Sequence, residues 1–239
     1  MNQYRQSPFA NLTPVVKNLL IINVIFYLAS RFLIPANIFD SYGNFSAYYF
    51  DSPFFKPWQI ITYMFMHDPR DIMHILGNMF ALFIFGPALE GMMGSKRFFN
   101  FYFICGIGAL FCNMAVQAFE VHNLIGTFTV SSQTVADPIV IVKIREIYGS
   151  QILGASGAIF GVLIAFAMLF PDVELMLIFL PIPIKAKYFV TIYVLFELFS
   201  GVRQSQGDSV AHFAHIGGAL FGFIMIKIWG LNRRDNHYY

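Results

Sequence analysis

Charged residues are scarce in this sequence. Asp, Glu, Lys and Arg make up 12% of the 239 residues, whereas 57% are hydrophobic and the mean hydropathy is +0.63. An ordinary soluble domain is about 45–50% apolar and about 25% charged. The shortage of charge therefore indicates an integral membrane protein. The formal net charge of +2 and the scattered basic residues also argue against nucleic acid as a partner.

Cysteine is almost absent as well. Cys105 and Cys112 lie seven residues apart in one apolar stretch. Two helical turns separate them, which is too far for a disulfide within a straight helix. We interpret both as small buried side chains. The sequence also lacks the pattern His-Glu-x-x-His, and its aspartates lie in loops or flanking segments, so neither a metalloprotease nor an aspartyl protease of the membrane is favoured.

Long apolar stretches are what the sequence does contain. Six of them reach, or nearly reach, the length of about 20 residues that a helix needs to cross a bilayer. They are residues 15–34, 74–93, 98–118, 155–170, 187–201 and 211–230. We predict an all-α membrane protein with a single domain over residues 1–239. Its bundle would have six transmembrane helices, and the short fourth helix would start inside the membrane.

Basic residues predict the orientation of these spans. If the N-terminus is cytoplasmic, nine Lys and Arg residues face the cytoplasm in short loops and six face the outside. Short cytoplasmic loops carry an excess of Lys and Arg. We therefore expect a multi-pass protein in a lipid bilayer with both termini in the cytoplasm. The first stretch is interpreted as a permanent span, because no Ala-x-Ala cleavage site follows it.

Polar residues within three of these stretches are candidates for a functional site, because polar groups in a bilayer are costly. His74 and Asn78 are four apart and share one helix face, Ser156 opens the fourth stretch, and His215 lies in the sixth. At a rise of 1.5 Å per residue, Ser156, His215 and His74 lie roughly 18–24 Å from the cytoplasmic ends of their helices. Three polar groups at one depth indicate a shared site.

Glycines offer a way to bring two of these helices together. Gly157 and Gly161 lie on the fourth stretch, and Gly218 and Gly222 on the sixth. Small residues four apart allow helix backbones to approach closely in membranes. We expect this contact to bring the serine hydroxyl and the imidazole of His215 within hydrogen-bond reach. A serine at a helix start also has free backbone N–H groups nearby, which could stabilise an oxyanion together with the side chains of His74 and Asn78.

These motifs resemble those of the rhomboid family. The serine lies in Gly154-Ala155-Ser156-Gly157, similar to the family's Gly-x-Ser-Gly. Residues 214–222 read Ala-His-Ile-Gly-Gly-Ala-Leu-Phe-Gly and are similar to its last-helix signature. His74-x-x-x-Asn78 is similar to its second-helix signature, and residues 94–97, preceded by Glu90, also look like family sequence. The resemblance runs from about Pro57 to Gly222.

The resemblance implies an intramembrane serine endopeptidase without cofactor or metal. Ser156 would be the nucleophile and His215 the general base, without a third acid, and His74, Asn78 and the Ser156 amide would stabilise the oxyanion. Its partners would be single-pass membrane proteins, cleaved in or near their transmembrane segment. Substrates would enter laterally past the second and fifth helices, beneath a cap at about residues 202–210. A bacterial inner membrane is the expected location.

Two features depart from the family pattern. Many members carry Tyr one turn after the serine, where this chain has Phe160, so packing against the ring has to orient His215. The outer loop at residues 119–153 is long and has no counterpart that we can match.

Other interpretations of these residues stay open from the sequence alone. Ser156 could satisfy local backbone at a helix start, and His212, one turn before His215, competes for the role of base. His74 and Asn78 could join helices by hydrogen bonding. We expect His67 to be an interfacial loop residue. Glu90 is expected to have a structural role, paired with Arg97 or with a backbone end.

Two other functions compete with the protease. A catalytically inactive relative would bind or escort membrane proteins, but such relatives typically lose the serine or the histidine, and both are present here. A transporter or channel would predict paired ionisable residues across spans or inverted repeats, and the sequence has neither.

Overall fold

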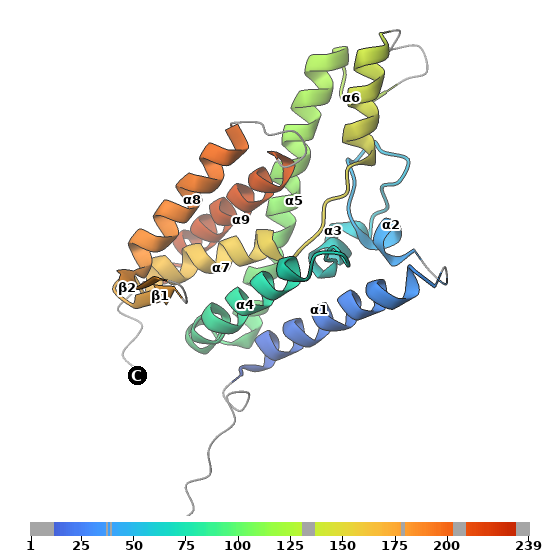
Figure 1. Cartoon of the computed structure of the whole chain (residues 1–239). Helices are drawn as coiled ribbons and strands as arrows, with labels where there is room; N and C mark the ends of the chain where they lie inside the picture. The colour runs from blue at the N-terminus through green and yellow to red at the C-terminus, as the bar shows by residue number, and fades with distance from the viewer. Residues whose placement is uncertain are drawn as a thin grey trace, which may run out of the picture.

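The protein is a bundle of α-helices with one small β-hairpin (Figure 1). The computed structural model describes residues 12–36, 38, 40–130, 137–177, 180–202 and 209–232. The elements in chain order are α1 (Pro14–Leu33), α2 (Ser41–Phe45), α3 (Gln59–Thr62), the 3₁₀ turn η2 (Tyr63–Phe65), α4 (Ile72–Met93), α5 (Ser95–Ile125), α6 (Pro138–Gly149), α7 (Ser156–Leu169), β1 (Glu174–Leu177), β2 (Leu180–Lys185), α8 (Ala186–Val202) and α9 (Ser209–Ile228).

Helices occupy all six of the apolar stretches. Among the described residues, three helices are long and apolar enough to cross a bilayer, namely α1, α4 and α5. Shorter apolar helices are found at Ser156–Leu169, Ala186–Phe196 and His212–Ile228. The protein is therefore a membrane protein of mostly helical structure, while the count of six spans stays a prediction.

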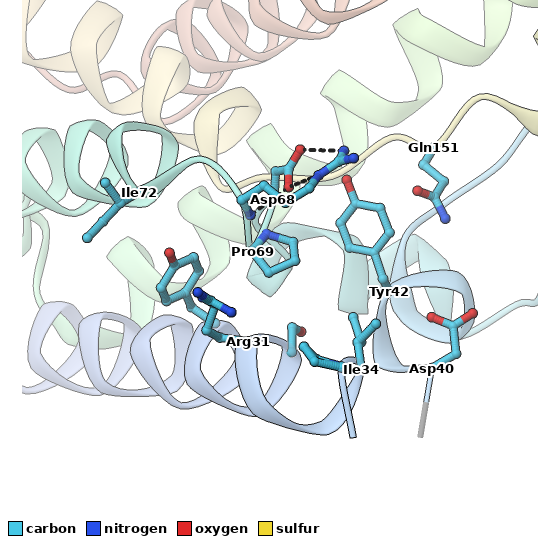
Figure 2. Close-up of a pocket in the computed structure, with 12 residues that line it drawn as sticks. Arg31, Ile34, Asp40, Tyr42, Asp68, Pro69, Ile72 and Gln151 are labelled. Carbon is cyan, nitrogen blue, oxygen red and sulfur yellow. Dashed lines mark hydrogen bonds and ion pairs between the residues drawn. The ribbon is translucent and has the colours of Figure 1, made fainter. Parts of the chain in front are cut away.

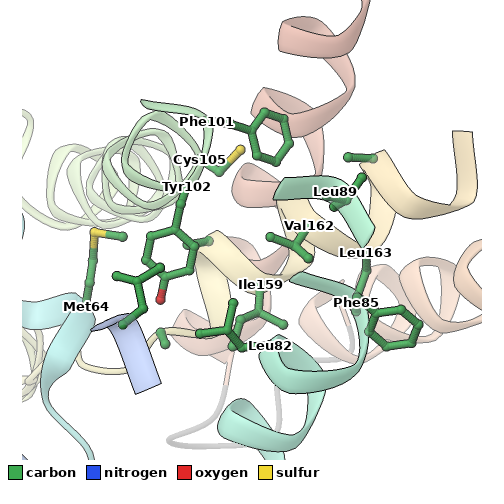
Figure 3. Close-up of a cluster of buried hydrophobic side chains, with 14 of the residues drawn as sticks. Met64, Leu82, Phe85, Leu89, Phe101, Tyr102, Cys105, Ile159, Val162 and Leu163 are labelled. Carbon is green, nitrogen blue, oxygen red and sulfur yellow. The ribbon is translucent and has the colours of Figure 1, made fainter. Parts of the chain in front are cut away.

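Helix α7 lies at the centre of the bundle, among α4, α5, α8 and α9 (Figure 1). Most of its 14 residues are buried, because its sequence is apolar around the whole circumference. Ile159, Val162 and Leu163 of α7 pack with Leu82 of α4 and Phe101 of α5 in the main core (Figure 3). Ser156, the first residue of α7, therefore lies in the interior of the bundle.

Helices α7 and α9 pack backbone against backbone. A methyl group placed on Gly222 would lie 2.6 Å from the Cα of Gly161, and one on Gly218 would collide with the carbonyl oxygen of Gly157. Such contacts are possible only where both helices present glycine. The two glycine pairs thus set the separation of the helices that carry Ser156 and His215.

Two helical segments occupy much of the described part of the outer region that follows the third apolar stretch. Helix α5 continues to Ile125, beyond the predicted end at residue 118, and stops at Gly126 in the left-handed conformation. Helix α6 packs beside this extension, and Val121 of α5 and Ile144 of α6 form a second small core with Tyr49. The extension was hidden in the sequence because its polar and charged residues break the apolar run.

A β-hairpin, which the sequence did not predict, joins α7 to α8. Strands β1 and β2 are antiparallel, with Glu174 opposite Lys185. Asp172 forms ion pairs with Lys185 at 3.6 Å and with Lys187 at 3.1 Å beside the hairpin. The hairpin lies at the end of the bundle where α4 and α9 end (Figure 1).

Glu90 of α4 caps the N-terminus of α1. Its carboxylate accepts hydrogen bonds from the backbone N–H groups of Val15 at 3.0 Å and Val16 at 2.9 Å, and from the hydroxyl of Ser95 at 2.6 Å. The side chain is buried. Of the two partners expected from the sequence, Arg97 or a backbone end, the structure shows the backbone end. A carboxylate at a helix N-terminus also opposes the positive end of the helix dipole.

We expect Glu90→Gln to lower the free energy of unfolding by about 2 kcal/mol, because the amide has one acceptor oxygen where the carboxylate has two and leaves a backbone N–H at the start of α1 unpaired. Unfolding in mixed detergent micelles would measure the loss. Glu146→Gln on the exposed face of α6 is the matched control and should change nothing. Equal stability of the two variants would contradict the capping role.

Candidate active site

Ser156 and His215 meet where α7 begins against α9. The Nε2 atom of His215 lies 2.8 Å from the Oγ atom of Ser156, although 59 residues separate them in the chain. Ser156 is the first residue of α7, so its backbone N–H belongs to the helix start that has no intrahelical acceptor. Both side chains are half-buried. The two elements that glycine packing draws together therefore carry a hydrogen-bonded hydroxyl and imidazole.

Phe160 fixes the plane of the imidazole. Its ring stacks on His215 with centroids 4.5 Å apart and an angle of 7° between the planes. Tyr193 of α8 packs on Phe160, with centroids 5.0 Å apart. His212 meets His215 only edge-on, at 6.4 Å between ring centroids. Of the two neighbouring histidines, His215 is thus the one hydrogen-bonded to the serine.

His74 reaches the same place from α4. Gly154 has φ of +118°, and its N–H donates to the carbonyl of Tyr63 at 3.0 Å. A methyl group on Gly154 would lie 2.8 Å from His74 Nε2 and 3.6 Å from Ser156 Oγ. The imidazole of His74 and the hydroxyl therefore border the same glycine. Only glycine fits here, because both the φ angle and the space exclude a side chain.

Asn78 forms a hydrogen bond with His67, which was expected from the sequence to lie away from the site. His67 is completely buried and its Nε2 lies 3.1 Å from Asn78 Nδ2. Its ring also packs edge-on against that of His74, with centroids 4.9 Å apart. Burial, followed by the nearby His74, lowers the pKa of His67 to about 3, so the ring is neutral. His67 is therefore a buried neighbour of the site and not the interfacial loop residue expected from the sequence.

The bond to His67 leaves Asn78 with a donor to spare. With the amide nitrogen of Asn78 facing His67, the amide donates to Nε2 in the tautomer of His67 that carries its proton on Nδ1. One of the two N–H bonds of Asn78 is used in this way, and the other can serve a ligand.

The combination has the parts of a nucleophilic site. A hydroxyl within hydrogen-bond reach of an imidazole is the arrangement that activates a serine. The ring of His74 and the N–H groups at the start of α7 lie near this hydroxyl, and groups of these types can donate to an oxyanion. Within the described ranges, no group of three or more His, Cys, Asp or Glu residues could hold a metal ion. The predicted cap, at about residues 202–210, falls mostly on residues 203–208, which lie outside the described residues.

The fold and this site define a membrane-embedded helical bundle built around a serine–histidine pair. A family model described as Rhomboid domain matches residues 55–231, well over half of the chain. The chain belongs to the rhomboid family.

Two relatives show the same kinship. The mitochondrial Rhomboid protein 1 of Saccharomyces cerevisiae is 28% identical over 165 residues, which are 69% of this chain and 40% of the yeast protein. The rhomboid protein YdcA of Bacillus subtilis is 28% identical over 173 residues, which are 71% of this chain and 68% of that protein. The chain thus matches less than half the length of the yeast relative.

Proposed function

We propose that this protein is an intramembrane serine endopeptidase that cleaves single-pass membrane proteins in or near their transmembrane segment. The observation that carries the proposal is the 2.8 Å contact between Ser156 Oγ and His215 Nε2. Membership of the rhomboid family supports it, as does the position of His74 beside the serine.

The proposed reaction follows the roles of a serine–histidine pair. Ser156 Oγ attacks the scissile carbonyl while His215 accepts its proton, and His215 then returns that proton to the leaving amine. The oxyanion forms beside the Ser156 amide, the His74 ring and the free N–H of Asn78. A water molecule, activated by His215, hydrolyses the acyl-enzyme. Stacking on Phe160 keeps the imidazole in line between these steps.

We further propose that all six apolar helices span the membrane, with both termini in the cytoplasm of a bacterium. Helix α7 has 14 residues and is roughly 21 Å long, shorter than a hydrocarbon core of about 30 Å. Its N-terminus would then start below the outer surface, where the half-buried serine and histidine can be reached by water. Hydrolysis inside a bilayer requires such access, because water is a reactant. The non-helical backbone that leads to α7 is also tolerated at that depth only where protein or water surrounds it.

A fluorophosphonate probe tests the pair directly. We expect the wild-type protein in detergent to be labelled at Ser156, and His215→Ala to slow labelling by about 100-fold or more, because the general base is lost. Mass spectrometry of the labelled peptide would identify the residue. His122→Ala, at the exposed end of α5, is the control and should be labelled at the wild-type rate. Labelling that is indifferent to His215 would refute the assignment.

A further inference from the structure

A pocket lined by both charged and apolar side chains lies between the end of α1 and the segment that leads into α4 (Figure 2). Its volume is about 940 Å³. Pockets that hold small ligands have volumes of about 300–1,000 Å³. Arg31, Asp40, Asp68 and Arg70 line it together with apolar groups such as Ile34. The pocket is thus large enough for a ligand and carries charges of both signs.

The pocket sits at the rim of the lipid-facing surface. Phe32 of α1 is 68% exposed, and Met73 at the start of α4 is 71% exposed. Further large exposed apolar side chains continue along both helices, at Ile21, Ile22, Val24, Ile25, Leu28, Ile72, Leu76, Phe80 and Ile84. In a helix that crosses a bilayer such side chains face acyl chains. A lipid beside α1 and α4 would therefore bring its headgroup to the level of the pocket.

Two of the four charges are already satisfied within the protein. The guanidinium of Arg70 donates to Asp68 through Nε at 3.1 Å and through Nη2 at 3.0 Å. These hydrogen bonds from Arg70 hold the pKa of Asp68 below its ordinary value, so the carboxylate is ionised at neutral pH. This closed pair forms one wall of the pocket (Figure 2).

The other two charges have no ion pair among the described residues. Arg31 lies in the last turn of α1 and is exposed, and no carboxylate lies within 4.0 Å of it in that part of the chain. Asp40 accepts a hydrogen bond from the N–H of Gly43 at 2.8 Å and makes no salt bridge there. Figure 2 shows Arg31 and Asp40 on either side of Ile34. A ligand with an anionic and a cationic group could therefore contact both.

We propose that this pocket binds the headgroup of a phospholipid that carries a phosphodiester and a primary ammonium group, as in phosphatidylethanolamine. Arg31 contacts the phosphate, since a guanidinium forks onto phosphate oxygens. Asp40 accepts hydrogen bonds from the ammonium. A quaternary choline has no N–H to donate, and a glycerol headgroup has no positive charge to balance the carboxylate. The acyl chains lie on the exposed faces of α1 and α4. This proposal depends neither on the protease activity nor on which leaflet of the bilayer faces the pocket.

Native mass spectrometry of the full chain, released from non-ionic detergent, tests the proposal. The protein is titrated with dioleoyl-phosphatidylethanolamine, -phosphatidylcholine or -phosphatidylglycerol. We expect the ethanolamine lipid to bind about tenfold more tightly than either of the others, which is the effect of one charge-assisted hydrogen bond. Equal binding of the three lipids would mean an adventitious annular contact and would overturn the proposal.

Matched variants locate the site. Arg31→Gln should weaken binding of the ethanolamine lipid about tenfold, and Asp40→Asn should bring it to the level of the choline lipid. Asparagine can still cap α2 at this position, so the fold is preserved. Arg97→Gln and Glu146→Gln remove exposed charges that do not line the pocket and should leave binding unchanged. Wild-type selectivity in both pocket variants would exclude the site.

A headgroup compound without acyl chains tests whether the ligand is a membrane lipid or a soluble phosphodiester. Glycerophosphoethanolamine has the same charges but no acyl chains to lie on α1 and α4. We expect it to compete only at concentrations about 100-fold higher than the lipid, because burial of apolar surface is lost. Competition at the same concentration would show that the pocket recognises a soluble ligand and would reject the membrane lipid. This comparison uses the wild-type protein and does not depend on how any variant folds.

Discussion

Ser156→Ala is expected to lower cleavage of a single-pass reporter substrate by at least about 10,000-fold, because the methyl group cannot attack a carbonyl. The fold should survive the change. Ser156 is half-buried, the hydrogen bond of its hydroxyl within the described residues is the one to His215, and a single such bond contributes about 1 kcal/mol to stability. Cleavage in proteoliposomes, measured against a panel of single-pass proteins beside a thermal unfolding curve, would separate the two effects.

Ser150→Ala is the matched control for this substitution. Ser150 lies on the segment between α6 and α7, six residues before Ser156, and within the described residues its hydroxyl makes no hydrogen bond. The control should cleave at the wild-type rate. If Ser156→Ala also cleaved at that rate, Ser156 would be removed from the mechanism. If it lost activity and the folded state together, the loss would count as structural, and the probe labelling of the wild-type protein would decide.

The helices of the six apolar stretches and the pairing of Ser156 with His215 could be predicted from sequence because local patterns determine them. A helix in a membrane needs a run of apolar residues, and that run is visible without any tertiary information. The spacing of Gly218 and Gly222 after His215 showed which face of the last helix packs closely, and hence which histidine of the pair His212 and His215 would meet the serine.

The features that the sequence did not reveal depend on tertiary contacts between segments that are far apart in the chain. His67 lies in an irregular segment with no periodicity, and only the fold shows that it reaches Asn78 on the following helix. Glu90 gave no sign of which backbone end it would cap, since Val15 and Val16 lie about 75 residues earlier. The extension of α5 and the helix α6 were missed for a different reason. A search for apolar spans stops where a helix leaves the bilayer and becomes amphipathic.

Gly218→Ala is expected to lower the free energy of unfolding by about 2–3 kcal/mol, because a single methyl group has no room between α7 and α9. The added carbon would collide with the carbonyl oxygen of Gly157, which is backbone and cannot rotate away. The helices must then separate, and His215 moves away from Ser156. A displacement of about 1 Å in a catalytic group can cost about 100-fold in rate. Both quantities should fall together, in unfolding measurements and in the reporter assay.

Gly77→Ala supplies the comparison, since a methyl group there meets nothing within 4 Å and Gly77 is exposed in the second turn of α4. Alanine should leave stability unchanged or raise it by up to about 1 kcal/mol, the difference in helix propensity. Gly222→Ala should behave like Gly218→Ala, because its methyl group would lie 2.6 Å from the Cα of Gly161. Should both α9 variants remain as stable and active as Gly77→Ala, the spacing of α7 and α9 would not be what holds Ser156 against His215. The pair would then have to be positioned by other contacts, of which the stacking of Phe160 on His215 is the first to test.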